Sequence, residues 1–158
     1  MTLDTMNFER SSVGMFAEGR VALEELIEYV KTTKRNGRYL SENPLVRQKI
    51  ARLFADLEVG HTLAYKIAWL QEQGGLSFAA YAASEAKVFG SELIHKIADL
   101  STEIMGLYGS LAKSKWAPIN GDMVESYQFP IAIAVDAGSS EIQRNIIAWM
   151  GVGLPRVK

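Results

Sequence analysis

Two copies of a Glu-x-x-His motif are the first residues of this sequence whose types and spacing could bind a metal. They run from Glu58 to His61 in "EVGH" and from Glu92 to His95 in "ELIH". A glutamate and a histidine three residues apart lie on one face of a helix. Di-iron proteins built from helical bundles use two such motifs together with two further glutamates. The pattern is therefore a candidate carboxylate–histidine site.

The helical phase of the second motif argues against a metal. The apolar stripe passes through Leu93, and Glu92 and His95 point about 100° and about 200° away from it at helical spacing. Di-iron bundles also usually separate the two motif-bearing helices by another helix, whereas these motifs fall on consecutive helices. We therefore expect no metal site and interpret these side chains as solvated charges on helix faces.

The closing stretch of the chain, residues 137–156, has the sequence of a well-delimited helix. Gly138 ends the preceding segment, Ser140 and Gln143 fit a capping box, and Glu141 lies in the first turn, where the helix dipole favours negative charge. An apolar stripe and a stop signal follow: Ile142, Ile146, Ile147 and Met150, then Gly151, Gly153 and Pro155. A serine-rich helix start either caps the helix only, which is the common case, or also holds a phosphate.

The composition excludes several classes of function. The 158 residues include 48% hydrophobic and 22% charged residues, which is typical of a soluble domain with a core of its own. The net charge of −1 gives no reason to expect nucleic acid or an acidic membrane surface as a partner. No cysteine is present, so disulfides, thiolate nucleophiles and cysteine metal sites are excluded. With neither a signal-peptide pattern nor a membrane-length apolar run, we expect a cytoplasmic protein without membrane insertion.

The elements that would position these residues are helices. Apolar residues recur at helical spacing over residues 8–34, 44–73 and 77–107, with a shorter segment up to residue 135 before the closing helix. Asn43 followed by Pro44 is a strong helix start, Gly74 and Gly75 mark a reversal, and Ser77 is a candidate cap for the third helix. The pattern predicts an all-α fold, an antiparallel four-helix bundle.

The closing stretch also resembles a family signature. "GSSEIQRNIIA" followed by "GVGLPR" is similar to the C-terminal signature of the acyl-CoA dehydrogenase family, Gly-Thr-Ser-Glu-Ile-x-Arg-x-x-Ile-Ala and then Leu-Gly-Leu-Pro-Arg. Five further segments agree in order and spacing: "NFER", "NGRYLSENPLVRQKIARL", "AYKIAWLQ", "SEAKVFGSEL" and "IMGLYGSL". The resemblance covers essentially the whole chain.

The resemblance implies a fold and an activity. Residues 1–158 would be one C-terminal helical-bundle domain, and the N-terminal helical and middle β-domains of a complete subunit would be absent. Members of this oxidoreductase family, which includes enzymes of fatty acid metabolism, oxidise acyl-CoA thioesters to 2,3-enoyl-CoA. A carboxylate removes the α-proton and the flavin of FAD accepts hydride. The implied partners are an acyl-CoA substrate, an electron acceptor such as an electron-transfer flavoprotein, and further copies or a related subunit in a dimer, tetramer or heteromer.

The resemblance also assigns the catalytic base. Many members carry the catalytic glutamate immediately before the Gly-Thr pair, but this position is Ala137 here. The branch that includes isovaleryl-CoA and long-chain dehydrogenases carries the base on the first bundle helix instead. The matching residue in "NFER" is Glu9, and Arg10 beside it matches a frequent arginine that we assign to substrate binding. Without the resemblance, Glu9 would be an ordinary glutamate of a first helical turn.

FAD contacts follow from the same resemblance. Ser139 and Glu141 match positions beside the phosphate and ribose side of the cofactor, and Glu103 and Gly106 match the segment that approaches its adenine end from a neighbouring subunit. The usual Arg-x-x-Phe-Gly appears here as "TKRNG", residues 33–37, without the arginine and phenylalanine at their places. Arg35 or Arg38 would have to substitute, unless they are loop surface charges.

Two rival functions remain open at this point. One is a non-catalytic helical assembly module or heteromer subunit, which fits the absent domains and the altered arginine motif. The other keeps the fold and changes the chemistry to that of an acyl-CoA oxidase or flavin monooxygenase. The sequence of this domain does not separate these chemistries, because oxygen access depends on the whole flavin pocket.

Overall fold

The structure, a computed structural model, describes the backbone of residues 12–73 and 76–156 and, apart from residues 76–79, their side chains. Glu9 and Arg10 lie outside the described residues. The α-helices are α2 (Val13–Thr32), α3 (Pro44–Glu72), α4 (Leu76–Met105), α5 (Asp122–Val135) and α6 (Ser140–Ile146). The shorter elements are β1 (Lys34–Arg35), β2 (Arg38–Tyr39), η1 (Leu40–Glu42), η2 (Gly106–Ser110), η3 (Pro118–Gly121) and the π-helical turn η4 (Ile147–Gly151).

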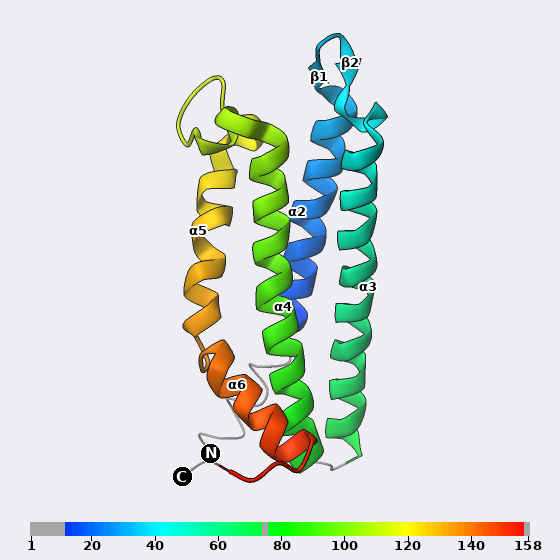
Figure 1. Cartoon of the computed structure of the whole chain (residues 1–158), viewed down its shortest axis with the longest axis vertical. Coiled ribbons are helices and arrows are strands. Elements are labelled where there is room, and N and C mark those ends of the chain that lie inside the picture. Colours follow the sequence, from blue (N-terminus) through cyan, green and yellow to red (C-terminus); the bar gives the residue numbers. More distant parts are fainter. Residues whose placement is uncertain (1–11, 74–75, 157–158) are drawn as a thin grey trace.

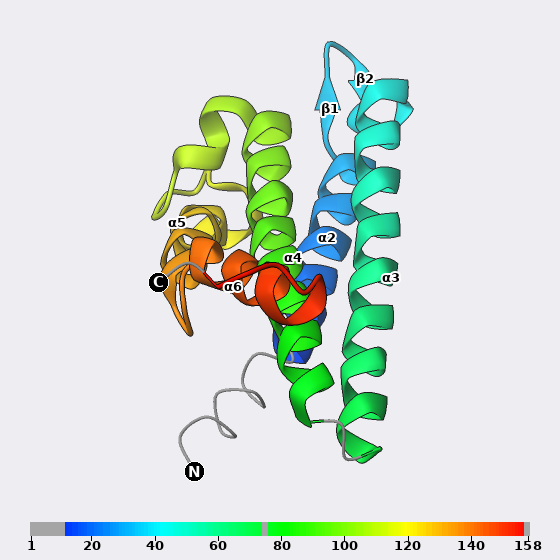
Figure 2. The ribbon, with the colours of Figure 1, turned by 60° about the horizontal axis from the view of Figure 1, so that its bottom comes forward.

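The predicted all-α bundle is confirmed. Helices α2, α3, α4 and α5 lie along the long axis of the molecule and alternate in direction, and α6 crosses α4 at one end (Figures 1 and 2). Helix α4 is central, because it packs against α2, α3, α5 and α6. The N-terminal end of α2 and the junction between α5 and α6 therefore lie toward the same end of the bundle, while the β-hairpin lies at the other.

The apolar faces of the helices form one core. Its buried members come from all four long helices, and at each of these positions less than a tenth of the residue is exposed: Phe16, Leu23, Leu26, Val30, Leu53, Leu57, Ile67, Ala86, Leu93, Ile97, Leu100, Ile104 and Met123. Leu107, expected on the stripe of α4, is 91% exposed instead. The helix ends before it, because Gly106 takes a left-handed conformation with φ of 62°.

The structure confirms the predicted start of α3 and corrects that of α4. The side chain of Asn43 accepts a hydrogen bond from the N–H of Leu45 at 2.9 Å, which confirms the cap of α3. The prediction for α4 is wrong, because this helix begins at Leu76 and includes Ser77. Between α2 and α3 the chain forms a two-residue hairpin whose turn, Asn36 and Gly37, has φ values of 54° and 81°. This is the Asn-Gly geometry that tight hairpins favour.

A helix that spans a membrane must be both long and apolar. None of the helices in residues 12–73 and 76–156 combines the length and apolar character that crossing a bilayer requires.

Candidate functional site

The junction between α5 and α6 is a tight turn held in an unusual backbone conformation. Ala137 and Gly138 both have positive φ, 51° and 97°. Glycine adopts this region freely, whereas a left-handed conformation costs alanine about 1–2 kcal/mol. Asp136 accepts the N–H of Ala137 on its own Oδ1 at 2.8 Å. The position where many acyl-CoA dehydrogenases carry glutamate is thus a strained alanine beside an exposed aspartate.

The cap of α6 lies one residue earlier than the sequence predicts. Ser139 is the N-cap, and its Oγ accepts the N–H of Ile142 at 3.4 Å. The predicted capping box of Ser140 and Gln143 is wrong, because Gln143 points inward. Its Nε2 donates to the carbonyl of Ala137 at 2.7 Å and reaches that of Gly138 at 3.4 Å. Gln143 is the fully buried residue of α6, whereas Ile142 of the predicted apolar stripe is 53% exposed.

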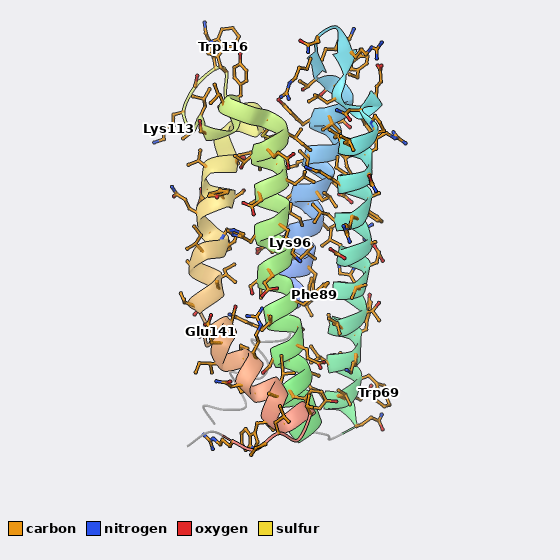
Figure 3. The ribbon with its side chains drawn as sticks, in the orientation of Figure 1. Trp69, Phe89, Lys96, Lys113, Trp116 and Glu141 are labelled. Carbon is orange, nitrogen blue, oxygen red and sulfur yellow. The ribbon has the colours of Figure 1, made fainter. Side chains whose placement is uncertain are left out.

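Glu141 extends from the first turn of α6 into solvent. Figure 3 places it at the junction of α5 and α6. A hydrogen bond from the Ser139 hydroxyl and one from the backbone N–H of Glu141 itself lower the pKa of its carboxyl, and Arg144 and Lys87 add smaller electrostatic contributions. Glu141 is therefore an ionised acceptor, suited to a hydroxyl donor and unsuited to direct contact with a phosphate.

A buried lysine approaches the same junction from α4. Lys87 is only 2% exposed, and its Nζ donates to the carbonyl of Ala134 at 3.1 Å. That carbonyl belongs to the last turn of α5, where unpaired carbonyls and the helix dipole favour a cation.

A shallow cavity of about 420 Å³ opens beside this junction, between α4 and α5. The surface inside the cavity is mainly apolar, although polar residues contribute to it. The lining residues are Ser91, Glu92, His95, Lys96, Pro130, Ile131, Ala134 and Ser140. An ion pair between Glu92 and Arg144 joins α4 to α6 at its edge. His95 lies against the ring of Tyr127, with 6.0 Å between the ring centroids.

The residues matched to the adenine end of FAD lie in the last turn of α4 and directly after it. The carboxylate of Glu103 is bound by Lys49 of α3, with 2.7 Å between Nζ and Oε2. In the part of the chain that the structure describes, no atom lies within 4 Å of a Cβ built on Gly106. Arg35 of the hairpin donates through Nη2 to the carbonyl of Ile104 at 2.7 Å. The altered arginine motif therefore still contacts the end of α4.

A cavity of about 630 Å³ lies between the hairpin and α4, with Arg35, Arg38, Tyr39, Asn43 and Ile104 among its lining residues. The structure does not bring the two predicted groups into one site. Ser140 lies beside Ser91 and Glu92 of α4. Gly106 directly follows the C-terminal residue of α4, about four helical turns further on, which at a rise of 1.5 Å per residue is about 20 Å away.

The Glu-x-x-His motifs do not form a shared site. Glu58 is paired with Arg20, and His61 packs edge-on against the ring of Phe16. Glu92 is paired with Arg144 as described above. Within residues 12–73 and 76–156, no group of three or more histidine, aspartate or glutamate side chains could hold a metal ion.

Sequence reasoning did not identify three of these residues as candidates for a site. Lys87 looks like an ordinary helix-surface residue and Gln143 like a capping-box residue, and the burial of both depends on how the helices pack. Asp136 is the carboxylate nearest to the position of Ala137, and only its place directly before that residue could have indicated it.

The family assignment rests on a comparison with known families. The profile described as "Acyl-CoA dehydrogenase, C-terminal domain" matches residues 1–150. This chain belongs to the acyl-CoA dehydrogenase family. Among curated relatives of this acyl-CoA dehydrogenase domain, "Acyl-CoA dehydrogenase FadE26" of Mycobacterium tuberculosis is 30% identical over 161 residues, covering 99% of this chain and 40% of the relative.

Two further similar proteins indicate assemblies. The "Caffeyl-CoA reductase-Etf complex subunit CarC" of Acetobacterium woodii is 28% identical over 94% of this chain and 37% of its own length. A solved structure of the ChsE4-ChsE5 complex from Mycobacterium tuberculosis superposes with a TM-score of 0.79 at 28% identity, over 90% of this chain and 37% of the other. The acyl-CoA dehydrogenase domain described here thus spans about two fifths of the length of the relatives it matches.

Proposed function

We propose that this chain is the C-terminal helical domain of an FAD-dependent acyl-CoA dehydrogenase that oxidises the α,β-bond of an acyl-CoA thioester. The observation that carries the proposal is the family match across residues 1–150. The chain spans 40% of FadE26, so the activity is that of an assembled flavoprotein to which these residues contribute. FAD, when bound, supplies the hydride acceptor for the β-carbon.

Glu9 is the proposed base for the α-proton, as in the isovaleryl-CoA and long-chain branch. Ala137 supplies no carboxylate at the alternative position, which supports a base elsewhere. Asp136 is the nearest carboxylate on that turn, but its Oδ1 is engaged by the N–H of Ala137. In a site closed against water, desolvation would raise the pKa of the catalytic carboxyl toward the operating pH. Arg10, next to Glu9, is the proposed substrate-binding residue.

The donors and acceptors at the α5–α6 junction fit the sugar-like part of FAD better than its phosphates. Glu141 is an exposed, ionised acceptor beside the Ser139 hydroxyl. Carboxylates accept hydrogen bonds from hydroxyl groups and repel phosphate oxygens. We therefore assign Ser139 and Glu141 to hydroxyl groups of the bound cofactor.

The end of the bundle that carries the β-hairpin fits the phosphate groups or the adenine of FAD. Gly106 leaves its backbone open to close approach, and the cavity that Ile104 of α4 lines also carries the guanidinium groups of Arg35 and Arg38. Arginine is well suited to phosphate oxygens. At the same end of the bundle, the carboxylate of Glu103 on α4 holds the ammonium group of Lys49 on α3 in place. Because this end and the α5–α6 junction are far apart along α4, we propose that each FAD is held by two copies of the domain or by this domain and a related subunit.

The proposed partners are an acyl-CoA substrate, a second subunit and an electron-transfer flavoprotein. Two similar proteins support this choice by their names, one in a two-protein complex and one in a complex with an Etf. The alternative is a non-catalytic assembly module, which is favoured by the absence of the usual arginine and phenylalanine from the motif at residues 33–37.

Flavin bleaching by acyl-CoA under anaerobic conditions tests the proposal in the assembled flavoprotein. Loss of a general base typically slows a reaction 10²- to 10⁴-fold, so we expect Glu9→Gln to slow bleaching by about this factor. Asp136→Asn is the matched control and should retain most of the rate. Normal bleaching in Glu9→Gln would refute the base assignment, and a flavin that no acyl-CoA bleaches would favour the assembly module.

A further inference from the structure

We propose that Lys87 and Gln143 are positioning residues that fix the turn between α5 and α6 from two sides. We call this pair the junction clamp. That the turn presents Ser139 and Glu141 to a cofactor rests on the proposed function, whereas the clamp itself rests on contacts of the described residues.

Three carbonyls of the junction, those of Ala134, Ala137 and Gly138, accept hydrogen bonds from buried side chains. Lys87 of α4 donates to Ala134 at 3.1 Å. Gln143 of α6 donates to Ala137 at 2.7 Å, with Gly138 at 3.4 Å. The two donors come from different helices, so the clamp fixes the turn relative to both α4 and α6.

Burying these two polar side chains costs free energy of folding unless their polar groups form hydrogen bonds. An ammonium group loses its hydration when it is buried, and Lys87 is 2% exposed. Gln143 is fully buried, and its Oε1 has no hydrogen-bond partner among the described residues. The orientation of the amide is fixed, because exchanging oxygen and nitrogen would place Oε1 against the carbonyl of Ala137. An apolar side chain of similar length would fill the same space without an unsatisfied oxygen.

The turn is a segment that needs such support. Ala137 has φ of 51°, and strained residues persist only where their surroundings over-determine them. Ser139 follows two residues later as the cap of α6, and Glu141 lies in its first turn. A shift of the turn would therefore move both proposed cofactor contacts together.

The test compares Lys87→Met and Gln143→Met with Lys96→Met, which removes an exposed lysine of the same helix. Backbone hydrogen exchange is measured at the junction, at the N–H of Asp136 and of Gln143, and in α3 at Leu53 and Leu57. We expect at least tenfold faster exchange at the junction in both clamp variants, unchanged exchange in α3, and wild-type behaviour in Lys96→Met.

Gln143→Glu separates a directed hydrogen bond from simple space filling. A protonated carboxyl can still donate to the carbonyl of Ala137, whereas the ionised form has only acceptors facing that carbonyl. We expect the amide chemical shifts of residues 136–139 to match the wild type at low pH and to move away as the buried glutamate ionises. A pH-independent spectrum in this variant, or unchanged junction exchange in Gln143→Met, would overturn the clamp. Gln143 variants keep the test open if Lys87→Met does not fold.

Binding of FAD to the same variants separates the two proposals. If the wild type binds FAD, both clamp variants should raise its Kd at least tenfold, and equal affinity would overturn the positioning role. If the wild type, tested as the assembled flavoprotein, binds no FAD, the proposed function fails, and the exchange and chemical-shift results still decide whether the clamp exists.

Discussion

The ring of Phe16 in α2 lies directly on the backbone of Gly60 in α3. A Cβ built on Gly60 would overlap the Cε1 and Cδ1 atoms of Phe16, and one built on Gly90 of α4 would lie 3.3 Å from the same ring. Phe16 is 1% exposed and packs edge-on against His61. Three helices meet at this ring, so the close approach fixes the spacing of the bundle near the N-terminal end of α2.

Gly60→Ala should therefore destabilise the domain. Overpacking a filled core typically costs about 1–3 kcal/mol, which exceeds the gain of up to about 1 kcal/mol from replacing a helical glycine by alanine. Gly14→Ala is the control, because Gly14 is exposed and no atom of the described residues 12–73 and 76–156 lies within 4 Å of an added Cβ. Urea unfolding should show a lower midpoint for Gly60→Ala and an equal or higher one for Gly14→Ala. A stabilised Gly60→Ala would mean that Phe16 can move away at no cost.

Ala137 offers a test of strain at the α5–α6 junction. Its φ of 51° suits glycine and is unfavourable for a β-branched residue. We expect Ala137→Gly to change the unfolding free energy by no more than about 1 kcal/mol, and Ala137→Val to lower it by about 1–2 kcal/mol. Equilibrium unfolding of the two variants measures this difference. Equal stability of the valine and glycine variants would show that the turn relaxes freely.

Arg35 should stabilise the hairpin against α4. Arg35→Ala removes the bond to the Ile104 carbonyl, and hydrogen bonds of charged groups contribute about 1.5–3 kcal/mol when well protected. Because Arg35 is largely exposed, we expect a loss of about 1 kcal/mol and faster exchange of hairpin amides. Arg38→Ala, on the opposite strand of the hairpin, should cost less than about 0.5 kcal/mol. A larger loss for Arg38→Ala than for Arg35→Ala would contradict the structure.

The Glu141 carboxyl should titrate below its usual pKa of 4.5. A lowered folded-state pKa means that ionised Glu141 stabilises the folded state above the unfolded pKa, and that this contribution is lost as the pH falls through the folded value. Ser139→Ala removes the main cause, so the pKa of Glu141 should rise toward its usual value. A carbon-detected NMR titration of Glu141 in both proteins checks this. No change in Ser139→Ala would exclude the hydroxyl as the cause.

The long helices could be predicted from the sequence because their apolar stripes repeat over many turns, and Asn43 with Pro44 marks a start that local chemistry determines. The end of α4 was missed at Leu107, since one glycine in a left-handed conformation overrides a continuing apolar pattern. The hairpin was missed because its strands have only two residues each, although Asn36 and Gly37 are a typical turn pair.

In the candidate site, only the residues that belong to the family motif could be predicted from the sequence. Ser139 and Glu141 were chosen by resemblance, and the structure places both at the start of α6. The roles of Gln143 and Lys87 depend on which helix each one faces after folding. A capping box is defined by sequence spacing alone, so the inward turn of Gln143 toward Ala137 could not be read from it.

The visible absorption spectrum of the purified chain, recorded after incubation with FAD and removal of free FAD by desalting, tests flavin binding most directly. We predict that the flavin band stays with the protein, that the complex elutes as an assembly larger than one chain, and that Glu141→Gln retains less flavin. Losing one hydrogen bond to a charged group should weaken binding about tenfold. A colourless protein at saturating FAD would contradict the proposal that two copies of this domain hold FAD between them, and would assign the site to this domain and a related subunit.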